Sequence, residues 1–416
     1  MIVMVLSIKS AFAFAQGTAP PILPPASAGP ADYATKSEVG ELYDQFRTFK
    51  NRLPFDLSAG VYLYYYQPLS ETTLSPGDLT GSFQVYAFYL ALDKQWHGLG
   101  GHAELRMRDG GHVGAGAANA YLRGFFSSNF WFQEIYAYYH PRRWFNLKAG
   151  KVYRQVGIFW DDSFFGNIEY FDGQKLNPDY GLSLEGEKGF SNDRFVLGWS
   201  AQYFYNSDGI NGGLDYQRTV GTVEGNPHTY SPNPEGELDF TGARTTEIKH
   251  IVDGRLTATA RPTRKLSIAL GASGLTGVVH RQIGSTPADE ARYSQAGGDL
   301  TVTAGPVIAY GEYLRQFGPG MRDADYVLAG VRAHFWRLSA RFNASYVNYH
   351  LAPVMEEFIL QPGVTATIGG GLSVIVEYDE WERRGVPTLT PNGRFVPTTG
   401  FAPYDRSLNV VLVYQY

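Results

Sequence analysis

Few residues of this chain are spaced for covalent or metal chemistry. Nine histidines occur, but none stands in an H-E-x-x-H pair or beside a G-x-S-x-G turn, and no glycine-rich phosphate loop is present. Cysteine is absent, so the chain offers neither a thiol nor a disulfide. We therefore expect no catalytic residue, no metal and no cofactor, and we predict that the protein is not an enzyme.

Charged residues instead alternate with apolar ones. In the segment 99–108, glutamate and arginine occupy one face and apolar residues the other, and segments 246–261 and 337–348 repeat the pattern. Successive side chains of a β-strand point to opposite faces, so each segment predicts a strand between an aqueous and an apolar environment. A soluble β-sandwich also alternates, so alternation alone does not decide between the two.

Segments in which polar and apolar residues alternate fill the chain from Pro54 onward. They predict about sixteen strands, at 55–67, 80–94, 99–108, 129–140, 143–152, 180–188, 194–206, 246–261, 264–274, 298–304, 306–317, 325–335, 337–348, 356–368, 371–379 and 404–416. The connections between them alternate between long and short. An even number of strands with long loops on one side and short turns on the other is typical of a membrane barrel, which has no free sheet edge.

The last strand has the strongest pattern. One of its faces is apolar or aromatic throughout, and comprises Leu408, Val410, Leu412, Tyr414 and Tyr416. The alternative is an edge strand of a soluble sheet that happens to be last.

Composition supports a membrane barrel. Aromatic residues make up 15% of the chain, with 29 Tyr and 26 Phe, and charged residues only 18%. Strands that face lipid need apolar residues and interfacial aromatic girdles. The net charge of −5 and the lack of a basic run exclude nucleic acid as a partner.

The first residues differ from the rest. Residues 1–15 predict a cleaved secretory signal peptide, although no basic residue precedes its apolar run, so the start codon is expected upstream. Residues 16–34 predict an extended Pro/Ala-rich linker, and 35–52 a short amphipathic helix. That helix would be a periplasmic coiled-coil stub, a partial plug, or a helix that only packs on the barrel rim. No segment of the chain is apolar over a length that would predict a helix spanning a membrane.

Taken together, the chain resembles the sixteen-stranded porins of the bacterial outer membrane, most nearly the substrate-selective group that includes the phosphate-selective porins. The resemblance is architectural over 54–416 and rests locally on 147–151, 152–163, 171–176 and 181–186. It implies an all-β fold, a transmembrane antiparallel barrel of about sixteen strands with a short N-terminal periplasmic helix. It also implies that the apolar face of the last strand is the signal for insertion into the outer membrane.

The resemblance further implies that the third long loop, 153–179, folds into the lumen and narrows it. The loop residues of this constriction would be Arg154, Asp161, Asp162, Glu169, Asp172 and Lys175. The pore wall would comprise Glu104, Arg106, Arg108, Lys148, Arg255, Arg332 and Arg341, opposed by Glu134, Glu185, Glu187, Asp253, Glu312 and Glu377. An acidic loop facing basic wall residues would create a transverse field. The alternative for any one charge is a solvated or ion-paired side chain without a role.

These features predict a passive channel for small hydrophilic solutes or ions. Its expected partners are outer-membrane lipid and lipopolysaccharide, the barrel-assembly machinery, the solutes, and two further copies in a homotrimer. An export channel for a polysaccharide and a hydrolase embedded in a barrel are the alternatives. No run of basic residues marks a phosphate ladder.

Loop lengths give a testable topology. We expect loops 153–179, 207–245 and 380–403 outside the cell and the turns near Pro141 and Pro262 in the periplasm. Protease added to intact cells should cut within the long loops alone. Cleavage confined to the short turns would reverse the topology.

Overall fold

The computed structural model describes residues 53–70, 82–107, 130–158, 179–206, 244–283, 286–317, 324–350, 355–384, 387–389, 395–397 and 404–415. The predicted signal peptide, linker and N-terminal helix lie outside these residues. Within the described ranges, the chain contains no helix whose length and apolar character would let it cross a membrane.

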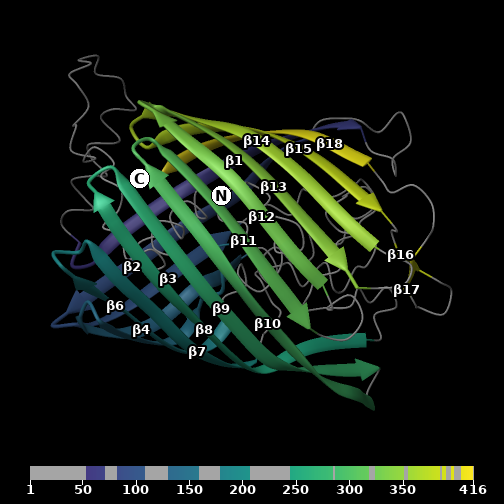
Figure 1. Cartoon of the computed structure of the whole chain (residues 1–416), viewed down its shortest axis with the longest axis horizontal. Coiled ribbons are helices and arrows are strands. Elements are labelled where there is room, and N and C mark those ends of the chain that lie inside the picture. The colour runs from purple at the N-terminus through teal and green to yellow at the C-terminus, as the bar shows by residue number, and fades with distance from the viewer. Residues whose placement is uncertain are drawn as a thin grey trace.

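Sixteen strands form one closed antiparallel barrel, in which neighbours in sequence are neighbours in the sheet (Figure 1). They are β1 (Asp56–Ser70), β2 (Ser82–Trp96), β3 (Leu99–Met107), β4 (Phe130–Arg142), β5 (Phe145–Val152), β6 (Asp179–Phe190), β7 (Phe195–Asn206), β8 (Arg244–Thr263), β9 (Leu266–Ile283), β10 (Thr286–Ala304), β11 (Val307–Phe317), β12 (Ala324–Phe335), β13 (Leu338–Tyr349), β14 (Met355–Gly369), β15 (Leu372–Arg384) and β18 (Tyr404–Gln415). The predicted all-β barrel fold is confirmed.

Two predicted loops were partly wrong. Residues 275–297 were expected to form a loop, but β9 and β10 stay paired as far as Ile283 and Thr286. Polar residues and glycines mask the alternation there, and the strands are joined by the backbone ladder and by a hydrogen bond of 3.0 Å between Thr276 Oγ1 and Ser294 Oγ. The predicted loop 380–403 contains the end of β15 and a separate hairpin of β16 (Pro387–Leu389) and β17 (Phe395–Pro397).

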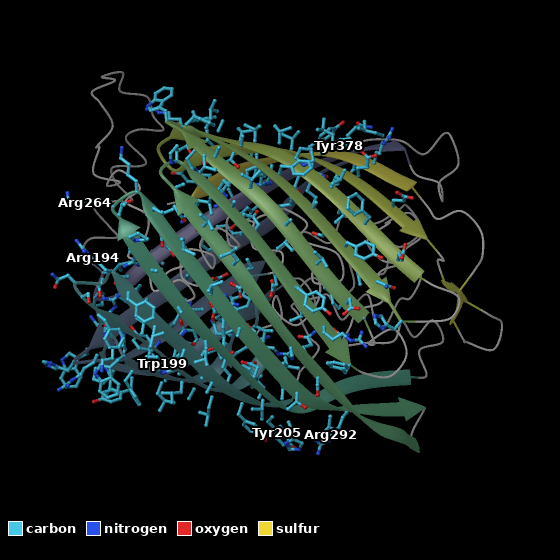
Figure 2. All side chains as sticks on the ribbon, in the orientation of Figure 1. Arg194, Trp199, Tyr205, Arg264, Arg292 and Tyr378 are labelled. Carbon is cyan, nitrogen blue, oxygen red and sulfur yellow. The ribbon has the colours of Figure 1, made fainter. Side chains whose placement is uncertain are left out.

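The predicted alternation of faces is confirmed along the described strands. On β8, Val252 and Leu256 are 50% and 66% exposed on the outside, whereas Asp253 and Arg255 between them are buried in the interior. Aromatic side chains such as Trp199 and Tyr205 project outward (Figure 2). The outer surface is therefore apolar and aromatic, as a surface in contact with lipid must be.

Short turns join the strands at one end of the barrel. Gly371, between β14 and β15, adopts a φ of +83°, and a Cβ atom there would collide with the carbonyl oxygen of Gln415. The carbonyl oxygen of Gly371 accepts a hydrogen bond of 2.9 Å from the Gln415 amide. Glycine fits this turn because it tolerates the left-handed conformation and the close approach of another backbone.

The last strand closes the barrel. β18 pairs with β15 on one side and with β1 on the other, where Leu412 lies opposite Leu63 and Val411 opposite Tyr64. Val411 and Val413 are buried inside, while Leu408, Val410, Leu412 and Tyr414 lie on the outer face. Tyr416 lies outside the described residues.

Deleting residues 407–416 should prevent assembly. The truncation would leave unpaired backbone groups on β1 and β15, at a cost of several kcal/mol for each group exposed to lipid. We expect no heat-modifiable barrel in the membrane fraction on gel electrophoresis. A deletion of the same length at 18–27, in the predicted linker, is the control, and normal barrel levels in the C-terminal truncation would contradict the account.

Candidate functional site

Polar side chains line the inside of the barrel. Inward-facing positions on adjacent strands carry buried polar and charged residues, including Ser183, Glu185, Gln202, Asp253, Arg255, Ser273, Asp299, Glu312, Asn343, Gln361, Glu377 and Asn409. Groups of this kind must find partners when water is excluded. The interior therefore carries many polar groups beside buried apolar residues such as Val411, and contacts among these polar groups hold the inward side chains in place.

A short segment after β5 provides some of these partners. Residues 153–158 leave the sheet and donate backbone hydrogen bonds to the side chains of three different strands. The Gln155 amide donates to Gln202 Oε1 on β7 at 2.6 Å, and the Gly157 amide to Ser273 Oγ on β9 at 2.9 Å. The Ile158 amide donates to Glu312 Oε2 on β11 at 2.8 Å.

The three acceptors place this segment inside the barrel. In the order of the barrel, β5 and β11 are separated by five intervening strands, and at about 4.8 Å per strand spacing the path along the wall is about 29 Å. The six residue steps from Val152 to Ile158 span at most about 21 Å when fully extended, and the Glu312 side chain covers the remaining distance to Ile158. Residues 153–158, which we call the chord, therefore run inside the wall from β5 toward β11.

Tight packing fixes the path of the chord. Gly157 has a φ of +63°, and a Cβ atom there would overlap the Glu312 carboxylate, so glycine is required at this position. Arg154 is 1% exposed, and its guanidinium lies 5.9 Å from the centre of the Phe204 ring on β7. Val156 and Ile158 are also buried.

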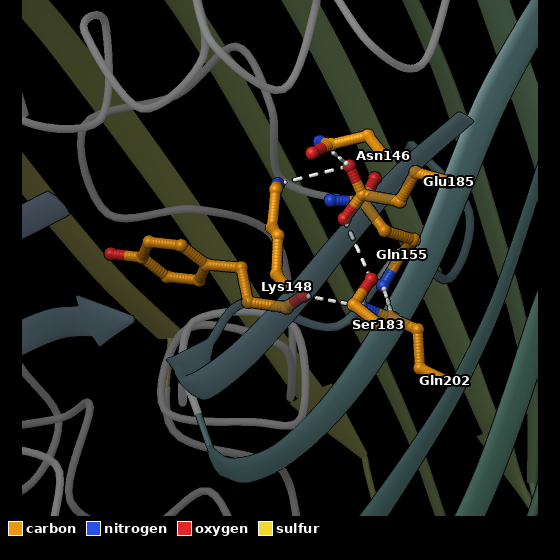
Figure 3. Close-up of polar contacts among 7 residues, drawn as sticks. Asn146, Lys148, Gln155, Ser183, Glu185 and Gln202 are labelled. Carbon is orange, nitrogen blue, oxygen red and sulfur yellow. Dashed lines mark hydrogen bonds and ion pairs between the residues drawn. The ribbon is translucent and has the colours of Figure 1, made fainter. Parts of the chain in front are cut away.

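The start of the chord rests on a hydrogen-bonded cluster on β5, β6 and β7 (Figure 3). Lys148 Nζ lies 2.9 Å from Glu185 Oε2, and Ser183 Oγ donates to Glu185 Oε1 at 2.7 Å. Gln202 Nε2 donates to the Tyr153 carbonyl at 3.0 Å and to Ser183 Oγ at 2.8 Å. The Gln202 side chain thus links the wall to the chord twice, with Oε1 as acceptor and Nε2 as donor.

Two further ion pairs lie on the inner wall. Arg255 Nη2 on β8 is 2.8 Å from Asp299 Oδ1 on β10, and Arg255 Nη1 is 3.1 Å from Ser273 Oγ. Arg341 on β13 pairs with Glu377 on β15. Truncating one member of such a buried pair leaves the other charge uncompensated, which costs roughly 3–5 kcal/mol.

The structure describes only part of the predicted constriction. There, Lys148 pairs with Glu185 on the adjacent strand. Arg255 reaches across β9 to Asp299, and Arg341 reaches across β14 to Glu377. Arg332 lies directly opposite Arg341, and Glu104 is buried on β3. The Arg106 side chain and Arg108, Asp161, Asp162, Glu169, Asp172 and Lys175 lie outside the described residues and side chains.

Sequence reasoning missed three residues that hold the chord and its surroundings. Gln202 and Ser273 accept hydrogen bonds from the chord. Asp299 pairs with Arg255, which also donates a hydrogen bond to Ser273. Each stands on the polar face of its strand, a signal present in the sequence. That signal does not show which inward side chains accept hydrogen bonds from a loop.

Removing the Glu312 carboxylate should loosen the end of the chord. In Glu312→Ala the Ile158 amide loses its acceptor, a loss of roughly 1–3 kcal/mol. We expect hydrogen–deuterium exchange of that amide to accelerate about tenfold or more. Glu312→Gln retains an amide oxygen as acceptor and should exchange much more slowly than Glu312→Ala, and equal exchange in wild type and Glu312→Ala would show that this bond does not hold the segment.

Comparisons with known proteins match the fold. No family model matches the chain, and no curated protein does. Solved structures that are similar over 87% of this chain include outer-membrane expressed OmpT of Vibrio cholerae (TM-score 0.51, 10% identity, 97% of that chain), the anion-selective porin from Comamonas acidovorans (0.53, 11%, 99%) and Salmonella typhi OmpF in complex with daunomycin (0.54, 12%, 97%). The chain shares its barrel fold with these proteins.

Proposed function

We propose that this protein is an outer-membrane channel through which small hydrophilic solutes or ions diffuse passively. The observation that carries the proposal is the opposite character of the two faces of the barrel wall. Apolar residues such as Leu256 and Leu270 face outward, and charged residues such as Arg255 and Asp299 face inward. A wall of this kind separates lipid from a polar interior and has no free edge.

The chord 153–158 would narrow this interior. It runs inside the wall from β5 toward β11 and is held by hydrogen bonds to Gln202, Ser273 and Glu312. We propose that the remainder of loop 153–179, with its carboxylates Asp161, Asp162, Glu169 and Asp172, continues the constriction and sets ion preference.

Pairing of the wall cations bears on the choice of solute. A channel specialised for phosphate or for an acidic polysaccharide needs basic side chains that are available to the solute. Lys148, Arg255 and Arg341 are each engaged by a wall carboxylate. This pairing favours a general channel over a polysaccharide exporter or a phosphate-selective pore.

The proposed setting is the outer membrane, with lipid and lipopolysaccharide around the barrel and the barrel-assembly machinery as the partner in insertion. The exposed outer-face residues Leu256, Leu270 and Phe342 fit contact with lipid or with a second copy. Assembly as a homotrimer remains a prediction that cross-linking of the purified protein would test.

Charge removal at the constriction should change ion selectivity. We expect Asp161→Asn with Asp162→Asn to shift the reversal potential in asymmetric KCl toward anion preference, because negative charge is lost from the narrowest region. Arg106→Ala with Arg108→Ala should shift it toward cation preference. Both shifts should be larger in dilute salt, since the screening length grows from about 3 Å at 1 M to about 30 Å at 0.01 M.

The control is Arg264→Ala, which removes an exposed charge from the short turn between β8 and β9. This change should leave the reversal potential close to that of wild type. A preparation that inserts as a folded barrel but conducts no current would overturn the proposed function. Conduction without any shift in either double variant would overturn only the assignment of the constriction.

A further inference from the structure

Three potential metal ligands lie together on the inner wall, on β3 and β4. His102 and Glu104 stand two residues apart on the inward face of β3, and Glu134 lies directly opposite Glu104 on β4. One imidazole nitrogen and one oxygen from each carboxylate all lie within 4.8 Å of one another.

The two glutamates bring two carboxylates side by side on neighbouring strands. Like charges directly opposite each other on neighbouring strands destabilise the pair, and Glu104 is only 6% exposed, so water screens it poorly. A bound cation would neutralise both carboxylates at once.

His102 is held in the orientation that suits a metal. Its Nδ1 lies 3.3 Å from Asp93 Oδ2 on β2, and Tyr138 donates a hydrogen bond of 3.0 Å to the other oxygen of Asp93. The imidazole also stacks on the Tyr136 ring, with 5.1 Å between ring centres. In the tautomer with its proton on Nδ1, the imidazole donates to this carboxylate and the Nε2 lone pair is available to a metal.

The other ring nitrogen of His102, Nε2, takes no part in the contact with Asp93. It is buried and has no hydrogen-bond partner among the described residues. A buried nitrogen without a partner is costly, whereas a metal-bound histidine typically shows this arrangement, with one nitrogen on the metal and the other donating to a carboxylate.

We propose that His102 Nε2, Glu104 and Glu134 bind one divalent transition-metal ion of the zinc class. Zinc takes nitrogen and oxygen ligands at about 2.0–2.2 Å in a tetrahedron, so its ligands lie about 3.4 Å apart. Rotation of the two glutamate side chains would bring the ligand atoms, which lie within 4.8 Å of one another, to this spacing. Calcium and magnesium fit less well, because both prefer oxygen ligands in greater number.

Three protein ligands leave one position of the tetrahedron open. That position would hold water or a carboxylate of a passing solute, as in zinc sites with three protein ligands. The pair of acidic ligands balances the charge of the ion, so the loaded site is neutral. This inference does not depend on conduction, because binding of the metal can be measured on the folded barrel alone.

The test is zinc titration of the purified, folded full-length protein by isothermal calorimetry after chelator treatment. We expect one ion per chain in wild type and loss of that site in His102→Gln and in Glu104→Gln with Glu134→Gln. Asp93→Asn, which changes the partner of His102 Nδ1 without removing a metal ligand, should weaken binding about 10–100-fold. Excess magnesium should not compete.

His350→Gln is the matched control, because His350 Nε2 pairs with Asp325 Oδ2 at 2.6 Å but belongs to no such cluster. It should leave zinc affinity unchanged. Heat modifiability of each variant shows that the barrel has folded, and a cobalt absorption spectrum of wild type gives a second readout of tetrahedral ligands. Equal zinc binding by wild type and folded His102→Gln, or equal loss in His350→Gln, would overturn the proposal.

Discussion

Backbone hydrogen bonding is the constraint on which the rest of this structure depends. In a wall that faces lipid, every amide and carbonyl must be paired within the protein, so the sheet has to close on itself. Pairing of β18 with both β15 and β1 achieves this, and Gly371 and Gln415 complete the final turn. Because side chains alternate between the two faces of each strand, every second residue of the closed wall points into the interior.

The interior then has to satisfy its own polar groups. Ion pairs between inward-facing side chains two strands apart do part of this, as Arg255 with Asp299 across β9 and Arg341 with Glu377 across β14. The chord 153–158 does another part by offering backbone amides to Gln202, Ser273 and Glu312. The same inner face also brings His102 and two glutamates together.

The strands of the wall could be predicted well from the sequence, and the contacts inside the barrel less well. Alternation identified all sixteen barrel strands because one face of each meets an apolar environment. It failed at 275–297, where glycines and polar residues on β9 and β10 interrupt the alternation although the two strands stay paired. Pairing of Lys148 with Glu185 depends on strand register, which a single sequence does not specify. The residues expected to follow the chord, Asp161 to Lys175, lie outside the described residues, so their place in the constriction stays a prediction.

The most direct test of a polar conducting interior uses two neighbouring residues on opposite faces. The chain has no cysteine, so Ser339→Cys, inward on β13, and Ala340→Cys, outward on the same strand, each introduce a unique thiol. A water-soluble, charged methanethiosulfonate reagent should reduce single-channel current through Ser339→Cys and leave Ala340→Cys unchanged. Reaction and current loss in Ala340→Cys with an inert Ser339→Cys would contradict the account.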